Sequence, residues 1–233
     1  MDEIYRQENQ QNRQALDSMT RNKHWDSSDF GNILIALAKT GQTIPSPNRP
    51  ETIHLQTWRP FVDKMWDHTK ATRDETGRVV LADMEKDKIV MGKLSVGDDA
   101  SVGVIATRQP GREAVQAAVA MIHCHPDGEM LGHGFSDQDY VSLMADPRMQ
   151  ATLVRYGDKK ALLALKTSVT PHHSEKVVSE RIKETLSDFM SQKQNPAVAL
   201  AQFNKMVCLE LGLTLYHMTP ASGDMFNRID VTT

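Results

Sequence analysis

Potential metal ligands crowd one short stretch of the sequence, residues 123–139, which reads HCHPDGEMLGHGFSDQD. Imidazole and carboxylate groups are common protein ligands of Zn²⁺ and of several other divalent ions. The stretch supplies seven of them, at His123, His125, Asp127, Glu129, His133, Asp137 and Asp139. The ligands of one ion must converge, so the secondary structure on which each side chain stands decides between them.

The first two histidines follow an apolar run, AVQAAVAMI, that predicts a β-strand. Side chains alternate between the two faces of a strand, so His123 and His125 would project from one face and Cys124 from the other. Pro126 has no amide hydrogen with which to continue strand pairing, which predicts that the two histidines stand at the strand end. They can therefore share one ion. The structural alternative is a pair of histidines that only form hydrogen bonds there.

A third ligand is predicted at the start of the following helix. The segment FSDQD is typical of a helix N-terminus with Ser136 as the N-cap, and the predicted helix runs from Asp137 to Ala145. Asp139 then takes the third helical position, which points back toward the preceding strand, whereas Asp137 points away. Zn²⁺ held by three protein ligands keeps a fourth position for water and lowers the pKa of that water to about 7.

Together these motifs resemble the signature of the JAMM (MPN-plus, or JAB-domain) zinc metallopeptidases, of the prokaryotic JAB type. The residues that carry the resemblance are His123-x-His125-Pro126, Ser136-x-x-Asp139 and, far upstream at a strand start, Glu75-Thr76-Gly77. The resemblance covers residues 53–170. It implies an α/β fold of the JAMM/MPN (cytidine-deaminase-like) type, in which helices pack a mixed β-sheet.

The resemblance also implies a role for each site residue. One zinc ion per chain would be held by His123, His125 and Asp139. Glu75 would act as general base and acid on the water that the zinc activates, and the Ser136 hydroxyl would stabilise the tetrahedral oxyanion. The ligand set also tolerates Fe or Mn in place of Zn.

The function that the resemblance implies is hydrolysis of an amide or isopeptide bond, at the C-terminus of ubiquitin or a ubiquitin-like protein. General chemistry agrees, because zinc supplies the nucleophile and polarises the carbonyl, while a carboxylate such as Glu75 passes a proton to the leaving amine. Two alternatives stay open. One is a hydrolase of a small amide, and the other is a scaffold that assembles through helical extensions. A scaffold has no need of all five site residues.

The loop between Pro126 and Ser136 departs from the family pattern. It spans residues 127–135, with three glycines among nine residues, and is longer than is usual in the family. Glycines permit unusual backbone angles, so this loop could reshape substrate access or bring Glu129 or His133 near the ion.

A different metal arrangement overlaps the same stretch. The residues His123, His125, Glu129 and His133 are spaced in a manner similar to the ligands of cupin barrels. Cupins carry a glycine where Ala117 stands here, and they continue as short strands, whereas this chain turns helical. The cupin arrangement is therefore disfavoured.

Hydrophobic periodicity predicts the elements that position these residues. Helices are predicted over residues 27–39, with Asp29 as the cap, and over residues 59–72, with Phe61, Met65 and Trp66 facing inward. Strands are predicted in IHLQ, RVVLAD, KIVMGKL and ASVGVIA, and the segments TLVRY and ALLALK predict a hairpin around GDKK.

The last third of the sequence is predicted to be helical. Apolar residues recur at helical spacing in two segments, at Val178, Ile182, Leu186 and Met190, and at Leu200, Phe203, Val207 and Leu211. Residues 219–233 are predicted to be a loop. We therefore expect three regions: a polar, helical extension with a linker at 1–50, the JAMM-like domain at 51–170, and a C-terminal helical extension at 171–233.

Composition indicates the class of binding partner and the cellular location. A formal net charge of −3 does not favour nucleic acid, and two cysteines are too few for a disulfide scaffold, which favours a reducing, cytoplasmic location. We expect no signal peptide and no membrane segment of roughly 18 apolar residues. The expected partner is a ubiquitin-like protein or a peptide substrate, without nucleic acid or membrane. The oligomeric state is left open.

Overall fold

A mixed β-sheet of ten strands forms the centre of the described chain. The computed structural model describes residues 2–98, 101–103, 111–112, 114–126, 134–190 and 196–229. The strand order is β1-β2-β10-β9-β8-β7-β6-β3-β4, and β5 pairs with β3. The strands are β1 (His24–Asp26), β2 (Thr52–His54), β3 (Thr76–Asp83), β4 (Lys88–Met91), β5 (Ser95–Val96), β6 (Gln116–Cys124), β7 (Ala151–Gly157), β8 (Lys160–Leu165), β9 (Thr214–Met218) and β10 (Met225–Arg228).

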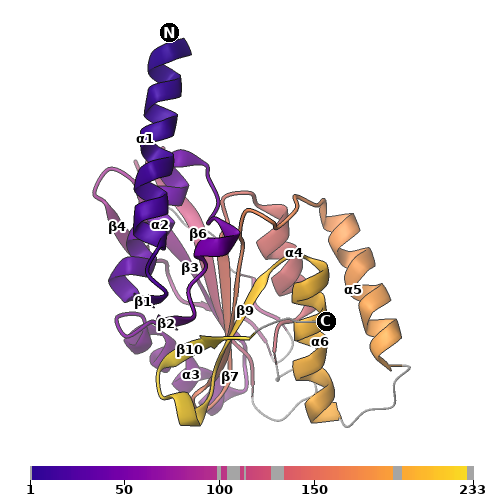
Figure 1. Cartoon of the computed structure of the whole chain (residues 1–233). Coiled ribbons are helices and arrows are strands. Elements are labelled where there is room, and N and C mark those ends of the chain that lie inside the picture. Colours follow the sequence, from indigo (N-terminus) through magenta and orange to yellow (C-terminus); the bar gives the residue numbers. More distant parts are fainter. Residues whose placement is uncertain are drawn as a thin grey trace.

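Six α-helices pack around this sheet, which confirms the prediction of an α/β fold (Figure 1). They are α1 (Asp2–Thr20), α2 (Ser27–Thr40), α3 (Arg59–Thr72), α4 (Asp137–Ala145), α5 (Glu175–Met190) and α6 (Pro196–Glu210), with short 3-10 helices at η1 (Ser46–Asn48) and η3 (Pro220–Ser222). Helices α2 and α3 contact β3 and β6 from one side, and α1 lies against α2. Helices α4, α5 and α6 cover the other side.

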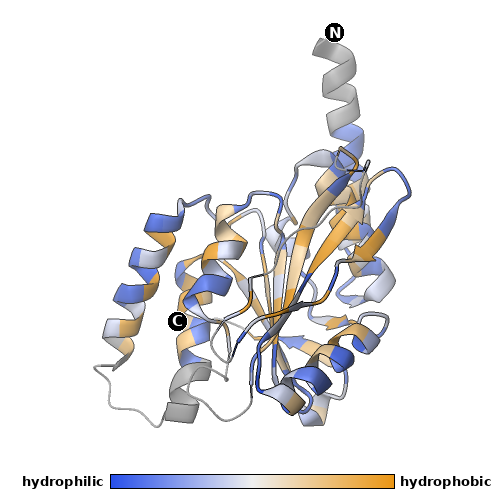
Figure 2. Cartoon of the chain, turned by 180° about the vertical axis from the view of Figure 1, so that it is seen from behind, coloured by the Kyte–Doolittle hydropathy of each residue, from blue (hydrophilic) through white to orange (hydrophobic). Residues whose placement is uncertain are grey.

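Each face of the sheet has its own hydrophobic core. The first core holds an aromatic group in which the Phe30 ring lies 6.3 Å from Trp25 and 5.3 Å from Trp58. Trp66 belongs to the same core. The second core lies under α4, α5 and α6 and includes Tyr140. Figure 2 shows the hydrophobic residues gathered along the strands, while the helices carry hydrophilic residues outward. All three tryptophans are buried, which confirms the predicted inward position of Trp66.

All three predicted regions contribute strands to the same sheet. Strand β1 comes from residues 1–50, strands β2 to β8 come from 51–170, and β9 and β10 come from 171–233. Trp25 and Phe226 both lie in the first core. The regional boundaries stay a prediction about sequence organisation. None of the described helices is long and apolar enough to cross a membrane.

Strand β6 is the element on which the site depends. All nine of its residues are buried, as expected for a strand covered on both faces. It pairs antiparallel with β3 and parallel with β7. Parallel neighbours need a crossover connection, and α4 lies on the one between β6 and β7. The chain therefore leaves the C-terminal end of β6 and enters α4 before it returns to the sheet.

Two predicted helices have the expected extent but differ in detail. In α2 the N-cap is Asp26, whose side chain accepts hydrogen bonds from the amides of Ser28 and Asp29. The prediction that Asp29 is the cap was wrong, because Asp29 occupies the third position of a capping box. In α3 the predicted inward orientation of Phe61 was also wrong. Phe61 is 40% exposed and packs against the Arg78 guanidinium instead.

The C-terminal region contains two strands that the sequence pattern did not predict. Strand β9 follows α6, and β10 lies within residues 219–233, so the prediction of a loop there was wrong. The four residues of β10 are too few to show an alternating pattern, and two of them are polar. In α5, Leu186 is exposed rather than inward, and Phe189 is buried in its place. Residues 101–103 of the predicted strand 100–106 are not in a strand, and residues 104–106 lie outside the described part.

Phe226 provides a test of β10. Its side chain is 4% exposed, and its strand lies between β2 and β9. Truncation of a buried phenylalanine leaves a cavity, so Phe226→Ala should lower the free energy of unfolding by about 3–5 kcal/mol in urea denaturation. The neighbouring Met225 is 39% exposed, and Met225→Ala should change that free energy by less than about 0.5 kcal/mol. Equal effects of the two variants would contradict the placement of β10.

A buried carboxylate at the end of β3 predicts how stability depends on pH. Asp83 accepts hydrogen bonds from Arg112 at 2.6 and 3.0 Å and from Gln116 at 3.2 Å. These bonds, with that from the Lys86 amide, hold the pKa of Asp83 well below its usual value although burial opposes this. A carboxyl with a lowered pKa in the folded state stabilises that state above about pH 4, and this stabilisation is lost as the pH falls further.

Asp83→Asn should therefore be less stable than the wild type at pH 7, and the difference should shrink as the pH falls below about 4. Urea denaturation at a series of pH values measures both curves. Asp87→Asn removes an equal charge from an exposed pair with Lys39 and should leave the pH dependence nearly unchanged. A difference between Asp83→Asn and wild type that stays constant with pH would contradict the assignment.

Candidate metal centre

The two predicted histidine ligands stand at the C-terminal end of β6. His123 pairs with Gly77 of β3, and the amide of His125, just past the strand, donates to the carbonyl of Arg155 at 2.9 Å. Both imidazoles lie on the side of the sheet that α4 covers, and they belong to one cluster with Asp139. The strand pairing on both sides of β6 therefore fixes the backbone positions from which they project.

Cys124 faces the other side of the sheet, as predicted from the strand alternation. It is fully buried in the first core, where its Sγ lies 3.9 Å from the carbonyl of Val62 in α3. Burial raises the pKa of this thiol to about 12, so the cysteine stays a protonated, apolar core residue.

Asp139 is held at the start of α4 by a capping box, as the segment FSDQD predicts. The Oδ2 atom of Asp139 accepts hydrogen bonds from the Ser136 amide at 2.8 Å and from the Ser136 hydroxyl at 3.0 Å. In return, the Asp139 amide donates to Ser136 Oγ at 3.2 Å. These contacts fix the carboxylate at the helix end that faces β6.

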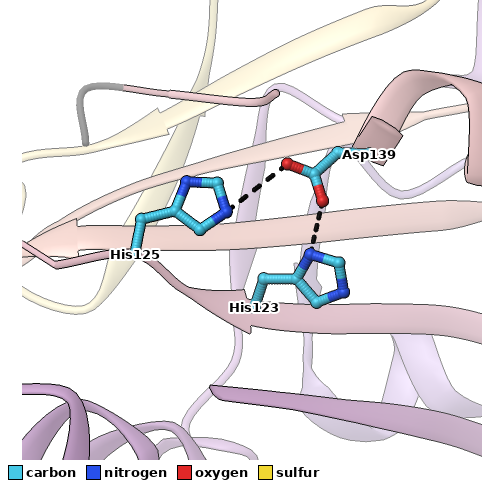
Figure 3. Close-up of side chains that lie close together, drawn as sticks. All are labelled: His123, His125 and Asp139. Atoms are coloured by element: carbon cyan, nitrogen blue, oxygen red, sulfur yellow. Dashed lines mark hydrogen bonds and ion pairs between the residues drawn. The ribbon is translucent and has the colours of Figure 1, made fainter. Parts of the chain in front are cut away.

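The Asp139 carboxylate lies between the two imidazoles (Figure 3). Its Oδ1 contacts Nδ1 of His123, and its Oδ2 lies 3.5 Å from Nε2 of His125. The exposed fractions are 7% for His123, 3% for His125 and 2% for Asp139, so the cluster is buried. One candidate ligand atom from each residue lies within 4.8 Å of the others.

Of the seven ligand-type residues in the stretch, three form this cluster. Asp137 is exposed on the first turn of α4, in agreement with the prediction that it points away. The predictions for Asp127, Glu129 and His133 fall on residues 127–133, which lie outside the described part of the chain.

Burial and the attraction between opposite charges shift the pKa values of the cluster residues in opposite directions. Burial alone would raise the pKa of Asp139, but the charge and hydrogen bond of His123 and the charge of His125 lower it well below its usual value. Burial alone would lower the pKa of His123, but the Asp139 carboxylate raises it. The carboxylate is therefore ionised and attracts positive charge to the space between the imidazoles.

The three residues fit a divalent metal ion. Two imidazole nitrogens and a carboxylate oxygen form a ligand set that suits Zn²⁺ and also Fe or Mn. Within the described ranges no group bonds Nε2 of His123, although this atom is buried. A buried polar atom of this kind normally has a partner. The nitrogen of His123 that faces the Asp139 carboxylate is Nδ1, which is the atom that an ion shared with Asp139 would take. The geometry supports a metal site and leaves the identity of the metal open.

Glu75 lies beside the cluster. It directly precedes β3, and since Thr76 pairs with Cys124, continuation of this register places Glu75 opposite His125. Its Oε1 lies 3.8 Å from Nε2 of His125, and its side chain is 14% exposed. Burial raises the pKa of Glu75; the charge of His125 lowers it and that of Asp139 raises it. The structure thus brings all five predicted site residues together, and their catalytic roles stay a prediction.

One residue at the edge of this site was missed by the sequence analysis. Asn204 of α6 is fully buried, and its Oδ1 accepts a hydrogen bond at 3.0 Å from the amide of Phe135, next to Ser136. The available signal was an asparagine directly after Phe203 on the apolar stripe of a predicted helix. Its partner lies 69 positions away in the sequence, so the pattern gives no indication of the contact.

Comparison with known proteins yields no match: no family model, no curated protein and no solved structure matches this chain. A function is therefore inferred from the residues of the site and their arrangement.

Metal content tests the site directly. The purified wild-type chain, loaded with zinc and then desalted, should retain about one zinc ion per chain in elemental mass spectrometry. Asp139→Asn removes the charged ligand and should retain almost none. Asp137→Asn makes the same change two positions earlier on the same helix and should retain as much zinc as the wild type. Equal retention by both variants would remove Asp139 from the ligand set.

Proposed function

We propose that this chain is a metal-dependent hydrolase of the JAMM type that cleaves an amide or isopeptide bond at the C-terminus of a ubiquitin-like protein. The observation that carries the proposal is the carboxylate of Glu75 beside a buried cluster of His123, His125 and Asp139. The arrangement corresponds to the five residues that the resemblance singles out.

The number and kind of ligands favour catalysis over a structural role. Structural zinc sites are usually closed by four protein ligands, often cysteines, whereas catalytic sites use three and keep one position for a reacting molecule. The described residues supply three, from His123, His125 and Asp139. A second carboxylate close to such a cluster adds negative charge at a buried position, and burying this charge costs folding free energy. Carboxylates in such environments are typical of functional sites.

In the proposed reaction, Glu75 transfers protons. A divalent ion bound by this cluster would activate a water molecule and polarise the substrate carbonyl. Burial raises the pKa of Glu75 toward neutral pH. A general base with a pKa near the working pH can accept a proton and then release it. Glu75 would first take a proton from the attacking water and then give it to the leaving amine, whose departure breaks the C–N bond.

Hydrogen bonds to two neighbouring residues fix the main chain at Glu75. Its amide donates to the carbonyl of Asp98 at 2.6 Å, and its carbonyl accepts from the amide of Gly97 at 2.9 Å. Both contacts come from the segment that follows β5. A general base on a paired backbone loses little freedom on reaction, which favours proton transfer.

Ser136 has a positioning role in addition to the proposed contact with the oxyanion. Its hydroxyl donates to Asp139 Oδ2 at 3.0 Å, so the hydroxyl orients a ligand of the cluster. The hydroxyl carries one hydrogen, so in the proposed contact it would turn from Asp139 and donate to the developing oxyanion when substrate is bound.

The choice of substrate rests on the resemblance. JAMM enzymes act on ubiquitin-like proteins. The presence of their residue pattern in this chain supports the same substrate class here. A small amide is the alternative substrate. The scaffold alternative is disfavoured by the buried carboxylates, because a scaffold gains nothing from placing Glu75 near Asp139.

Glu75→Gln separates metal binding from turnover. The variant should bind about one zinc ion per chain but hydrolyse substrate at least about 100-fold more slowly, because the amide cannot accept the proton. The assay uses the zinc-loaded protein with ubiquitin-fold proteins that carry a C-terminal peptide extension or an isopeptide-linked lysine, and mass spectrometry detects the products.

The matched control is Asp74→Asn, which removes a carboxylate from the adjacent position outside the cluster and should keep turnover within about twofold. Turnover by Glu75→Gln at the wild-type rate would exclude Glu75 as the acid and base. A zinc-loaded wild type that cleaves none of these substrates would overturn the proposed reaction.

A further inference from the structure

Asn204 of α6 forms a double contact with the segment that carries Asp139. Its Oδ1 accepts one hydrogen bond from the amide of Phe135 at 3.0 Å and a second from the hydroxyl of Tyr140 at 2.8 Å. Asn204, Phe135 and Tyr140 are all buried. One side-chain oxygen therefore joins the C-terminal helix to two points on the loop and helix that form the site.

The two contacts enclose the capping turn of α4. Phe135 directly precedes the N-cap Ser136, and Tyr140 directly follows Asp139. A shift of either neighbour would move the Asp139 carboxylate relative to the imidazoles of β6. The hydrogen bonds to Asn204 oppose such a shift at both ends of the turn.

Other contacts show that residues 134–140 pack closely against α6. The rings of Phe135 and Tyr140 pack edge to face with centroids 5.3 Å apart. A Cβ atom on Gly134 would lie 2.2 Å from Nδ2 of Asn204, so a larger residue at 134 would push the loop away from α6. The Tyr140 hydroxyl also lies 3.7 Å from Sγ of Cys208, one turn further along α6.

Packing alone does not explain an asparagine at this place. A buried amide costs free energy unless its polar atoms are bonded, and a leucine of similar size would suit the apolar stripe of α6 better. The buried amide of Phe135 needs an acceptor, and Asn204 provides it. Asn204 therefore satisfies a backbone amide of the segment before α4 and contributes little to the packing of α6 itself.

We propose that Asn204 is a positioning residue through which the C-terminal helix α6 sets the geometry of the metal centre. By holding Phe135 and Tyr140, it keeps Ser136 and Asp139 at the distance from β6 at which the carboxylate reaches His123. This inference rests on the metal-binding part of the proposed function and not on the identity of the substrate. It assigns residues 196–210 a role in the site itself.

The test compares variants of similar shape in the full-length chain. Asn204→Leu keeps the volume and removes the acceptor, whereas Asn204→Asp keeps the acceptor oxygens. Val207→Ala, on the same buried stripe of α6, weakens packing in the second core without removing a hydrogen bond to Phe135 or Tyr140, and controls for lost stability. Gly134→Ala and Tyr140→Phe disturb the contact from the other side, so the test does not depend on the folding of one variant.

The first readout is the binding of Co²⁺, a spectroscopic substitute for Zn²⁺. Loss of a residue that orients a ligand typically weakens metal binding about 10- to 100-fold. Asn204→Leu and Gly134→Ala should show this loss together with an altered visible absorption spectrum, Tyr140→Phe a smaller loss, and Asn204→Asp partial recovery. Val207→Ala should stay within about threefold of the wild type. Wild-type affinity and spectrum in both Asn204→Leu and Gly134→Ala, or an equal loss in Val207→Ala, would overturn the proposal.

The second readout does not need a metal. Hydrogen exchange of chelator-treated protein should show faster exchange at the Phe135 amide in Asn204→Leu and Gly134→Ala, with the β6 amides unchanged. Unchanged exchange at Phe135 would contradict the contact. A wild-type chain that binds no Co²⁺ would refute the proposed function, and the exchange of Phe135 would still decide whether Asn204 holds the loop.

Discussion

The site depends on one carboxylate, that of Asp139, which is bound from two directions. Its Oδ2 closes the capping box with Ser136 at the start of α4, and its Oδ1 contacts His123 at the end of β6. The group is 2% exposed, and a buried charge is tolerated only when it is paired and hydrogen-bonded. Helix start and strand end are therefore tied together by the same group that would bind a metal.

The topology of the sheet explains why these ends meet. The crossover from β6 to β7 brings the N-terminus of α4 to the edge where β6 ends, and the antiparallel partner β3 begins at the same edge. Ligands of open α/β sheets commonly bind at such edges. Glu75 reaches His125 because it precedes the first paired residue of β3, and α6 approaches from the covered face through Asn204. Three parts of the chain that are distant in sequence, namely the start of β3, the pair β6 and α4, and α6, thus place polar groups around one point.

Local patterns were enough to predict the parts of the site that depend on local geometry. Strand alternation placed His123 and His125 on one face with Cys124 opposite, and N-cap chemistry placed Asp139 toward them and Asp137 away. Glu75 was found through the family resemblance, because no local pattern distinguishes it from the neighbouring Asp74. Asn204 and Phe226 were missed because their contacts are set by tertiary packing, and Phe61 was misplaced because helical spacing does not show which apolar residue lies at the edge of a face.

Every proposal for this chain requires that His123, His125 and Asp139 bind one metal ion. A crystal of the zinc-loaded chain, measured at wavelengths above and below the zinc absorption edge, tests this most directly. We expect one anomalous peak that lies about 2.0–2.2 Å from a nitrogen of each histidine and an oxygen of Asp139. A map with no peak there, or with zinc held by other residues while His123 and Asp139 stay in direct contact, would contradict it.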